Sequence, residues 1–182
     1  MPSAERLEPG TNPPDEINVV IEIPKDSNLK YEMDSENGEI YVDRVLSPAM
    51  FYPLNYGFIP KTRESSGING DSDPIDVFIL GNYSLNPKSV IRCRPIGILL
   101  TEDQAGVDSK IIAVPLTKID PAFSTVEDID DVPKYLKMQL KHFIEHHKDL
   151  EEKKGKYVKI IAWEGRDAAK LKITEAMKRY KE

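Results

Sequence analysis

This sequence is poor in cysteine and histidine. Its one cysteine, Cys93, cannot form a disulfide bond within the chain, and it stands in the largely apolar run 90–94. There we expect a small buried side chain rather than a nucleophile. Three histidines in 182 residues also leave few nitrogen ligands for a zinc site.

Long apolar runs and a basic binding pattern are missing as well. No segment reaches the roughly 20 apolar residues that a membrane-spanning helix needs, and residues 1–6 lack the apolar core of a signal peptide. The chain has 25 Lys and Arg against 31 Asp and Glu, a formal net charge of −6. We therefore expect a cytoplasmic protein with no membrane partner and no nucleic-acid partner.

The sequence does contain a series of short strand patterns followed by helical ones. Strands are expected at 18–23, 29–33, 39–45, 76–80, 90–100, 110–114 and 157–163, and helices at 133–149 and 166–181. The dipeptide Asn37-Gly38 predicts a hairpin turn, and Asp131 is a candidate cap for the first helix. The length suits one domain over 1–182, with an N-terminal arm over 1–16. This order indicates an α+β fold, a β-barrel with helices packed on it.

Three carboxylates occur within six residues, at Asp71, Asp73 and Asp76. Like charges this close repel one another unless a cation lies between them. Pro74 favours an extended backbone at Asp73, so Asp71 and Asp73 would project to one side of the chain, about 7 Å apart. Asp76 then begins an apolar strand, which is a rigid base for a site. A solvated Asp-Ser-Pro turn is the simpler alternative.

Two other metal-binding patterns fit this chain poorly. In an EF-hand loop counted from Asp71, the sixth residue should be Gly and is Asp76, and the twelfth should be Glu and is Asn82. Residues 142–146 match the H-x-x-E-H pattern of zinc peptidases. Matches of five residues recur by chance, so we do not favour zinc hydrolysis.

A second acidic segment carries Asp103 and Asp108, and its simpler interpretation is a hairpin tip around Gly106. The five aspartates of the two segments offer only oxygen ligands, which hard cations prefer, Mg²⁺ above all. Basic and phenolic side chains stand on or near the expected strands, at Lys30, Arg44 and Tyr56. Acidic groups that hold metal, with cations around them, suit a metal-bound polyphosphate substrate.

Longer motifs carry a family resemblance. They are 20–24 (VIEIP), 30–32 (KYE), 42–44 (VDR), 51–53 (FYP), 55–57 (NYG), 73–77 (DPIDV), 90–95 (VIRCRP) and 143–150. With these motifs in this order, the chain resembles the soluble family I inorganic pyrophosphatases of prokaryotic type over nearly its whole length. The resemblance implies a five-stranded, OB-like closed β-barrel with two flanking helices and a site in the barrel mouth. It also implies Mg²⁺-dependent hydrolysis of inorganic pyrophosphate to two orthophosphates, by direct in-line attack of a metal-bound hydroxide.

The family's site residues carry over position by position as implications of the resemblance. The metal ligands would be Asp71, Asp76, Asp103, Asp108 and Glu22, with several Mg²⁺ ions per site. The catalytic residues would be Asp73, which takes the proton of the attacking water, and Tyr56, which contacts phosphate or water. The substrate-binding residues would be Lys30, Arg44, Tyr56, Lys110, His147 and Lys148, supported by Glu32.

Two residues depart from the family pattern. Ser72 stands where the family has Gly between two aspartates, and because Gly often marks a positive φ, we expect a negative φ or a shifted loop here. His147 stands where the family has a phosphate-binding Tyr, just before Lys148. Its reference pKa of about 6.5 predicts an added titration near neutral pH, and a pH profile that changes in His147→Tyr.

The resemblance also implies a homo-oligomer, because compact family members form hexamers that are dimers of trimers. His142 and His146 would then lie near a subunit contact. Two other activities compete with this interpretation. One is Mg²⁺-dependent hydrolysis of nucleotides or other phosphoesters, with a base held by residues 51–60, which we expect to form a packed, irregular aromatic wall. The other is an OB-like nucleic-acid module, whose binding would weaken steeply with salt.

Overall fold

The computed structural model describes residues 7–34, 37–64, 73–104, 106–151 and 157–181. Its strands are β1 (Ile17–Ile23), β2 (Leu29–Met33), β3 (Ile40–Val45), β4 (Asn55–Phe58), β5 (Asp76–Ile79), β6 (Val90–Asp103), β7 (Gly106–Pro115) and β8 (Val158–Gly165). Its helices are α1 (Lys134–His146) and α2 (Arg166–Lys181), with short 3₁₀ helices η2 (Pro121–Phe123) and η3 (Ile129–Asp131). The predicted strands and helices are confirmed to within a few residues, and the α+β class with them.

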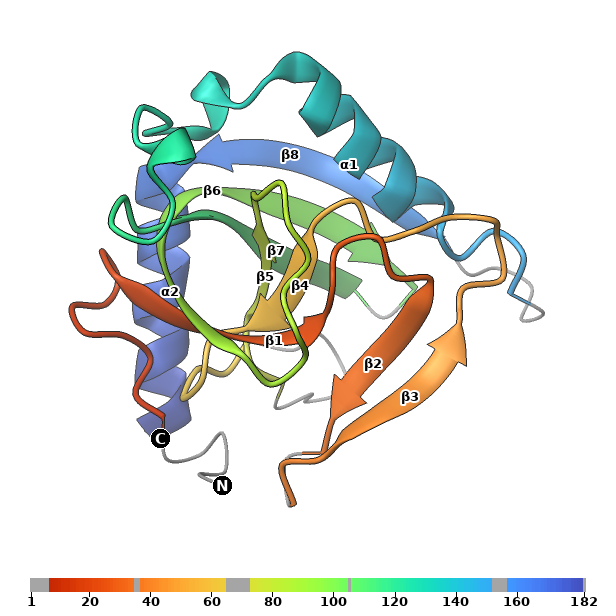
Figure 1. The fold of residues 1–182 in the computed structure, drawn as a ribbon, viewed down its shortest axis with the longest axis horizontal. Coiled ribbons are helices and arrows are strands. Elements are labelled where there is room, and N and C mark those ends of the chain that lie inside the picture. Colours follow the sequence, from red (N-terminus) through yellow and green to blue (C-terminus); the bar gives the residue numbers. More distant parts are fainter. Residues whose placement is uncertain (1–6, 35–36, 65–72, 105, 152–156, 182) are drawn as a thin grey trace.

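The strand pairings follow one another in a circuit. Within the described residues, one sheet has the order β1-β4-β5-β7-β6-β8, and β2 and β3 form a separate ribbon. β1 pairs with β4 along one edge and with the start of β6 along the other. The pairings therefore run from β1 through β4, β5, β7 and β6 and return to β1. Figure 1 shows these strands curving around a common centre, with β8 alongside β6 and the β2–β3 ribbon projecting to one side.

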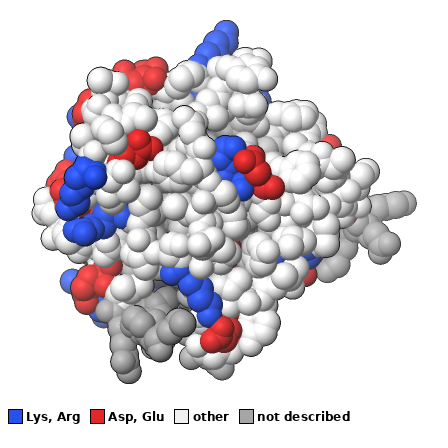
Figure 2. Space-filling view, viewed as in Figure 1, with Lys and Arg blue, Asp and Glu red and all other residues white. Residues whose placement is uncertain are grey.

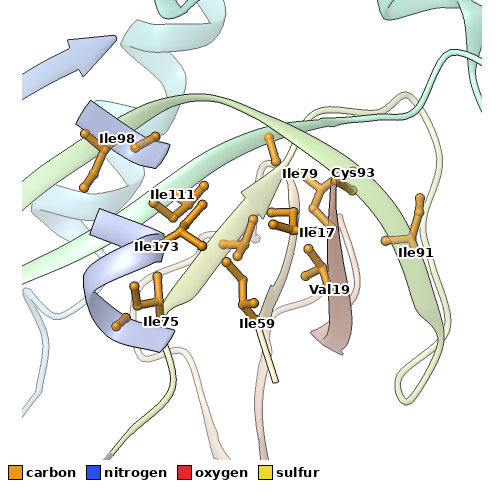
Figure 3. Close-up of a cluster of buried hydrophobic side chains, with 14 of the residues drawn as sticks. Ile17, Val19, Ile59, Ile75, Ile79, Ile91, Cys93, Ile98, Ile111 and Ile173 are labelled. Carbon is orange, nitrogen blue, oxygen red and sulfur yellow. The ribbon is translucent and has the colours of Figure 1, made fainter. Parts of the chain in front are cut away.

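Alternation of side chains along the strands produces two buried clusters. On β5, Val77 and Ile79 belong to the cluster that α2 covers, whereas Phe78 belongs to the cluster that α1 covers. Figure 3 shows Ile173 of α2 among the side chains of the first cluster. Both faces of these strands are buried, which explains why their sequences are almost continuously apolar. Neither helix of the described residues has the length and apolar character needed to cross a bilayer.

Cys93 belongs to the α2-side cluster and is fully buried. Burial raises the pKa of its thiol well above the usual value, so the side chain stays neutral at physiological pH. The prediction of a small buried side chain is confirmed.

Two glycines meet specific backbone requirements. Gly38 has φ = 70° in the hairpin between β2 and β3, as Asn37-Gly38 predicts. In β4, a Cβ added to Gly57 would lie 1.9 Å from the carbonyl oxygen of Val20 in β1. The two strands therefore approach at a distance that only glycine allows.

Two sequence-based assignments of strands are corrected. Residues 51–60 are not irregular throughout, because they contain β4. Pro and Gly argue against a strand in the sequence, yet Gly57 is what permits pairing with β1. The second acidic segment is a hairpin end, as its simpler interpretation predicts, but the strands extend further than expected: β6 runs to Asp103 and β7 begins at Gly106. Asp103 and Asp108 therefore stand on paired strands.

The cap of the first helix differs from the prediction. α1 begins after Pro133 and has no side-chain cap. Asp131 instead belongs to η3, where its Oδ2 accepts hydrogen bonds from the amides of Glu127 and Asp128. The predicted cap is therefore wrong, because Asp131 is the last residue of a 3₁₀ turn that precedes α1.

Candidate active site

Two adjoining cavities bring the predicted site residues together. The first, of ≈ 220 Å³, is lined by Arg44, Asp103, Asp108, Lys110, His147 and Lys148. The second, of ≈ 460 Å³, is lined by Glu22, Glu32 and Asp73. Both are lined by Lys30, Tyr56 and Asp76. Asp71 and Ser72, including the expected backbone conformation at Ser72, lie outside the described residues.

Strand register explains why residues far apart in the sequence meet here. Asp76 on β5 is the register partner of Lys110 on the parallel strand β7. Asp108 precedes Lys110 by two residues, so both side chains leave β7 on the same face. That face also carries Ile112, which packs in the α1-side cluster. These candidate residues of β5 and β7 therefore lie on the strand face toward α1.

Lys110 is the centre of a charged hydrogen-bond network. Its Nζ donates to Asp76 Oδ2 at 2.6 Å, to Asp108 Oδ2 at 2.9 Å and to the hydroxyl of Tyr56 at 3.1 Å. Burial by itself would lower the pKa of Lys110, but the carboxylate of Asp76 and the other acidic groups raise it well above the usual value. Burial works to raise the pKa of Asp108, yet the Lys110 ammonium outweighs it and holds that pKa below the usual range.

Tyr56 contributes a neutral hydroxyl to the same network. Burial, aided by the nearby charge of Asp76, raises the pKa of Tyr56 well above the usual value. Its ring packs edge-on against Phe78, with ring centroids 4.8 Å apart. The hydroxyl is thus held in place and stays protonated, so it can donate a hydrogen bond to an oxyanion in the cavity.

The cations of the β2–β3 ribbon also stand side by side. Lys30 and Arg44 are register partners, and both contact Asp43, Lys30 Nζ at 3.4 Å and Arg44 Nε at 2.9 Å from Oδ2. Lys30 also pairs with Glu32, and Arg44 Nη1 lies 2.8 Å from Glu151 Oε1. The supporting role predicted for Glu32 is consistent with its contact to Lys30.

Glu22 lines the second cavity, and its carboxyl group has an unusually high pKa. Burial raises the pKa of Glu22 to about 7, with a further contribution from Asp76, although the amide of Met33 donates to Glu22 Oε1 at 2.9 Å and opposes the shift. The carboxyl group therefore changes charge near neutral pH in the metal-free protein. A bound cation would favour its ionised form.

The pKa of His147 differs from the value expected from the sequence. Its Nδ1 lies 3.1 Å from the carbonyl oxygen of Phe143 and 2.9 Å from that of Ile144. The ring stacks on Phe143 with centroids 5.1 Å apart. Burial, with the nearby charge of Lys148, lowers the pKa of His147 to about 4. The predicted titration near neutral pH is therefore wrong: the imidazole is neutral there, with its Nδ1 proton donated to the backbone.

Four site residues were missed by the sequence interpretation. They are Asp43, Tyr52, Glu64 and Glu151. Asp43 could have been found, because it stands beside Arg44 in the VDR motif. Tyr52 stands in the aromatic run and packs on Phe143 at 4.7 Å between ring centroids. Glu64 and Glu151 have no local signal, because their partners lie 45 and 107 residues away in the chain.

The H-x-x-E-H pattern occupies the solvent side of α1. The rings of His142 and His146 lie 4.5 Å apart, and His146 Nδ1 lies 2.7 Å from Asp149 Oδ2. Neither histidine lines the two cavities. Within the ranges that the structure covers, no group of three or more His, Cys, Asp or Glu side chains could hold a metal ion. The zinc interpretation therefore gains no support.

The donor chemistry of the first cavity nevertheless fits a hard cation. Asp76, Asp103 and Asp108 offer carboxylate oxygens, which Mg²⁺ prefers. The first and last of these already share one positive charge, the Lys110 ammonium. Asp71, which the resemblance adds to these ligands, lies outside the described residues.

The family of the chain follows from three comparisons. A family model described as inorganic pyrophosphatase matches residues 19–181. The chain is 53% identical over 174 residues to the inorganic pyrophosphatase of Sulfolobus acidocaldarius, with 96% of each chain covered. It is 47% identical over 173 residues to that of Escherichia coli K12, with 94% of each covered.

Solved structures agree with the sequence relatives. The fold matches the crystal structure of inorganic pyrophosphatase from Thermus thermophilus with a TM-score of 0.92 at 41% identity, covering 100% of both chains. The inorganic pyrophosphatase of Helicobacter pylori gives a TM-score of 0.90 at 44% identity, covering 98% of this chain and 100% of that one. The chain therefore belongs to the inorganic pyrophosphatase family, as a prokaryotic-type member of family I, and is an enzyme of the inorganic diphosphatase class.

Proposed function

We propose that this chain hydrolyses inorganic pyrophosphate to two orthophosphates with Mg²⁺, by direct in-line attack of hydroxide derived from water and without a covalent phospho-enzyme. One observation carries the proposal. Three aspartates and four basic side chains line the same small cavity: Asp76, Asp103, Asp108, Lys30, Arg44, Lys110 and Lys148. A polyphosphate that arrives with metal ions needs both kinds of group, one for the metal and one for the phosphate oxygens.

The basic residues would bind and orient the two phosphoryl groups. Lys30 and Arg44 are adjacent on the ribbon, whereas Lys148 Nζ lies 3.3 Å from Asp103 Oδ2 across the cavity. Cations from two sides can hold one phosphoryl group while the other leaves. The neutral Tyr56 hydroxyl would donate to a phosphate or water oxygen, and neutral His147 would contribute contact through its ring.

The acidic residues would hold the metal. Asp76, Asp103 and Asp108, with Asp71 and with Glu22 on the second cavity, form the proposed set of Mg²⁺ ligands. Bound Mg²⁺ supplies Lewis acidity, lowering the pKa of coordinated water and neutralising developing phosphate charge. Lys110 pairs with both Asp76 and Asp108. Its ammonium holds the pKa of Asp108 below the usual range, so the Asp108 carboxylate remains ionised at neutral pH.

Asp73 would accept the proton of the attacking water. It lines the second cavity together with Asp76 and Glu22, close to the proposed metal ligands. Its main-chain oxygen accepts a hydrogen bond from the amide of Glu64 at 2.9 Å. This bond restrains the backbone of Asp73, which a residue that transfers protons needs.

The competing activities find less support. A nucleotide base would need an accessible aromatic ring beside the cavities. Tyr52 is buried and Tyr56 packs between Tyr52 and Phe78, while the exposed Phe51 lines neither cavity. A nucleic-acid module would need a basic face, yet the site combines basic with acidic side chains. Competition between ATP and pyrophosphate separates hydrolysis of nucleotides from hydrolysis of pyrophosphate.

The first test is orthophosphate release from pyrophosphate while Mg²⁺ is titrated from zero. We expect Mg²⁺-dependent release by the wild type, and a kcat reduced about 10²–10⁴-fold in Asp73→Asn, the usual contribution of a general base. Asp130→Asn is the matched control, because this exposed aspartate lines neither cavity. No release by the wild type at any Mg²⁺ concentration would reject the proposed activity. An unchanged kcat in Asp73→Asn would reject only the role of that residue.

Three further proposals concern the whole molecule. The circuit of pairings from β1 back to β1 supports a closed, OB-like five-stranded barrel. The exposed residues Tyr135 and Met138 on α1 support a subunit contact near His142 and His146, as in a homo-hexamer that is a dimer of trimers. The absence of a disulfide partner for the single cysteine is compatible with the proposed cytoplasmic location.

A further inference from the structure

Glu64 links the two parts of the site on which the proposed function depends. The backbone amide of Glu64 donates a hydrogen bond to the main-chain oxygen of Asp73 at 2.9 Å. Its side chain turns the other way, where Oε1 accepts from the amide of Ser109 at 3.0 Å. Ser109 immediately follows Asp108 on β7. One residue thus holds the backbone beside the proposed proton acceptor and the backbone beside a proposed metal ligand.

The bond to Ser109 fills a position that the sheet leaves open. The pairing of β5 with β7 begins with Asp76 opposite Lys110, so the amide of Ser109 lies just before that pairing begins. Ser109 is buried, with 1% of its surface exposed. A buried amide without an acceptor costs free energy, and the Glu64 carboxylate supplies that acceptor.

Helix α2 holds Glu64 in this position. Lys172 Nζ lies 2.9 Å from Glu64 Oε1, with the side chains only 19% and 13% exposed. The preceding residue is tied to the same helix, because the amide of Arg63 donates to the carbonyl of Ala176 at 3.1 Å and Arg179 Nε donates to the carbonyl of Arg63 at 3.1 Å. Ala176 packs in the buried α2-side cluster, so this support is rigid.

We propose that Glu64, held by Lys172 of α2, is a positioning residue that aligns Asp108 and Asp73 for Mg²⁺ binding and proton transfer. The inference rests on the proposed function, since it takes the roles of these aspartates from it. Groups that orient metal ligands without touching the metal typically change metal affinity or activity 10–100-fold when removed. Through Glu64, the strand that carries Asp108 is connected to α2, which packs on the opposite face of the strands.

The test measures Mg²⁺ binding by calorimetry, with Mg²⁺ alone as probe, beside pyrophosphate hydrolysis, in the full chain. We expect Glu64→Ala to raise the Mg²⁺ dissociation constant at least about 10-fold and to lower kcat, with a smaller rise in Lys172→Met. Glu64→Gln keeps an oxygen acceptor for Ser109, so it should stay within about 3-fold of the wild type. Lys170→Met is the matched control, because Lys170 lies on the same helix and pairs with Asp15 away from both cavities.

The possible results distinguish failure of this inference from failure of the proposed function. Mg²⁺ affinity in Glu64→Ala equal to that of the wild type would overturn the inference alone. Equal losses in Glu64→Gln and Glu64→Ala would also overturn it, since charge and not the hydrogen bond would then act. A wild type that binds no Mg²⁺ would overturn the proposed function as well. If Glu64→Ala does not fold, as judged by circular dichroism, Lys172→Met decides, because it leaves the carboxylate in place.

Discussion

Two carboxyl groups of this site have pKa values that are shifted in opposite directions. Glu22 and Asp108 are both partly buried carboxyl groups, yet the pKa of Glu22 is raised to about 7 and that of Asp108 is lowered. The difference is the partner: Asp108 has the Lys110 ammonium at 2.9 Å, whereas Glu22 accepts a hydrogen bond from a neutral amide and faces the charge of Asp76. Burial outweighs the more weakly acting charge of Lys30 at Glu22, whereas the directly paired Lys110 outweighs burial at Asp108.

The lowered pKa of His147 predicts that the folded protein loses stability in acid. Its pKa is about 4 in the folded protein and about 6.5 in an unfolded chain. Between these values the unfolded state binds the extra proton, so the free energy of unfolding falls as pH falls from about 6.5 to about 4. We expect His147→Tyr to remove this dependence, up to about 3 kcal/mol across the interval. Urea unfolding at pH 7 and pH 4.5 measures it.

The control for this prediction is Lys178→Gln, a substitution at an exposed position on α2, away from the contact proposed at His142 and His146. It should leave the difference between the two pH values close to that of the wild type. Equal pH dependence in wild type and His147→Tyr would contradict the partly buried, neutral imidazole. The activity of His147→Tyr should likewise show no titration removed near pH 6.5.

At the scale of elements, strand pairing depends on one close approach. Gly57 lets β4 meet β1, and the same strand carries Tyr56 into both cavities. Pairing of β4 with β5 then sets Tyr56 opposite Phe78. The position of the site is therefore coupled to the β1–β4 contact.

Gly57→Ala should break this contact. The added Cβ would lie 1.9 Å from a backbone oxygen, which cannot move without displacing a strand, so we expect a loss of about 3 kcal/mol or more in the free energy of unfolding. Gly81→Ala is the matched control, because its Cβ would meet the Tyr83 ring at 3.3 Å, and a side chain can yield. That variant should lose less than about 1 kcal/mol. Similar losses in both variants, measured by urea unfolding, would contradict this explanation.

At the scale of the whole molecule, charge is distributed in small balanced groups. On the face shown in Figure 2, Lys and Arg side chains lie beside Asp and Glu side chains, with larger uncharged areas between them. The net charge of −6 favours solubility over attraction to nucleic acid. Uncharged surface between such groups is compatible with contacts between copies of the chain.

The proposed assembly predicts a response to acid. Protonation of His142 and His146 would place positive charges at the subunit contact, so the hexamer should loosen as pH falls. Sedimentation velocity at pH 8 and pH 5.5 checks this, with a double variant His142→Gln and His146→Gln as control. The same oligomer at both pH values would count against a contact at these histidines.

The sequence by itself determined the elements other than β4, the candidate residues and the family. Strand and helix periods depend on neighbours two to four residues apart, and that information is local. Each predicted site residue that the structure describes lines at least one of the two cavities. Motifs such as DPIDV and VDR specify chemistry through short spacings, which a sequence displays directly.

Only the tertiary structure decided which residues meet and what charge they carry. The pairing of β5 with β7 sets Lys110 between Asp76 and Asp108, and no local pattern encodes that register. The neutrality of His147 and the support of Glu64 by Lys172 likewise follow from burial and from partners far along the chain. Proton affinity and orientation are properties of the assembled surroundings, because solvent exclusion and neighbouring charges act through space and not along the sequence.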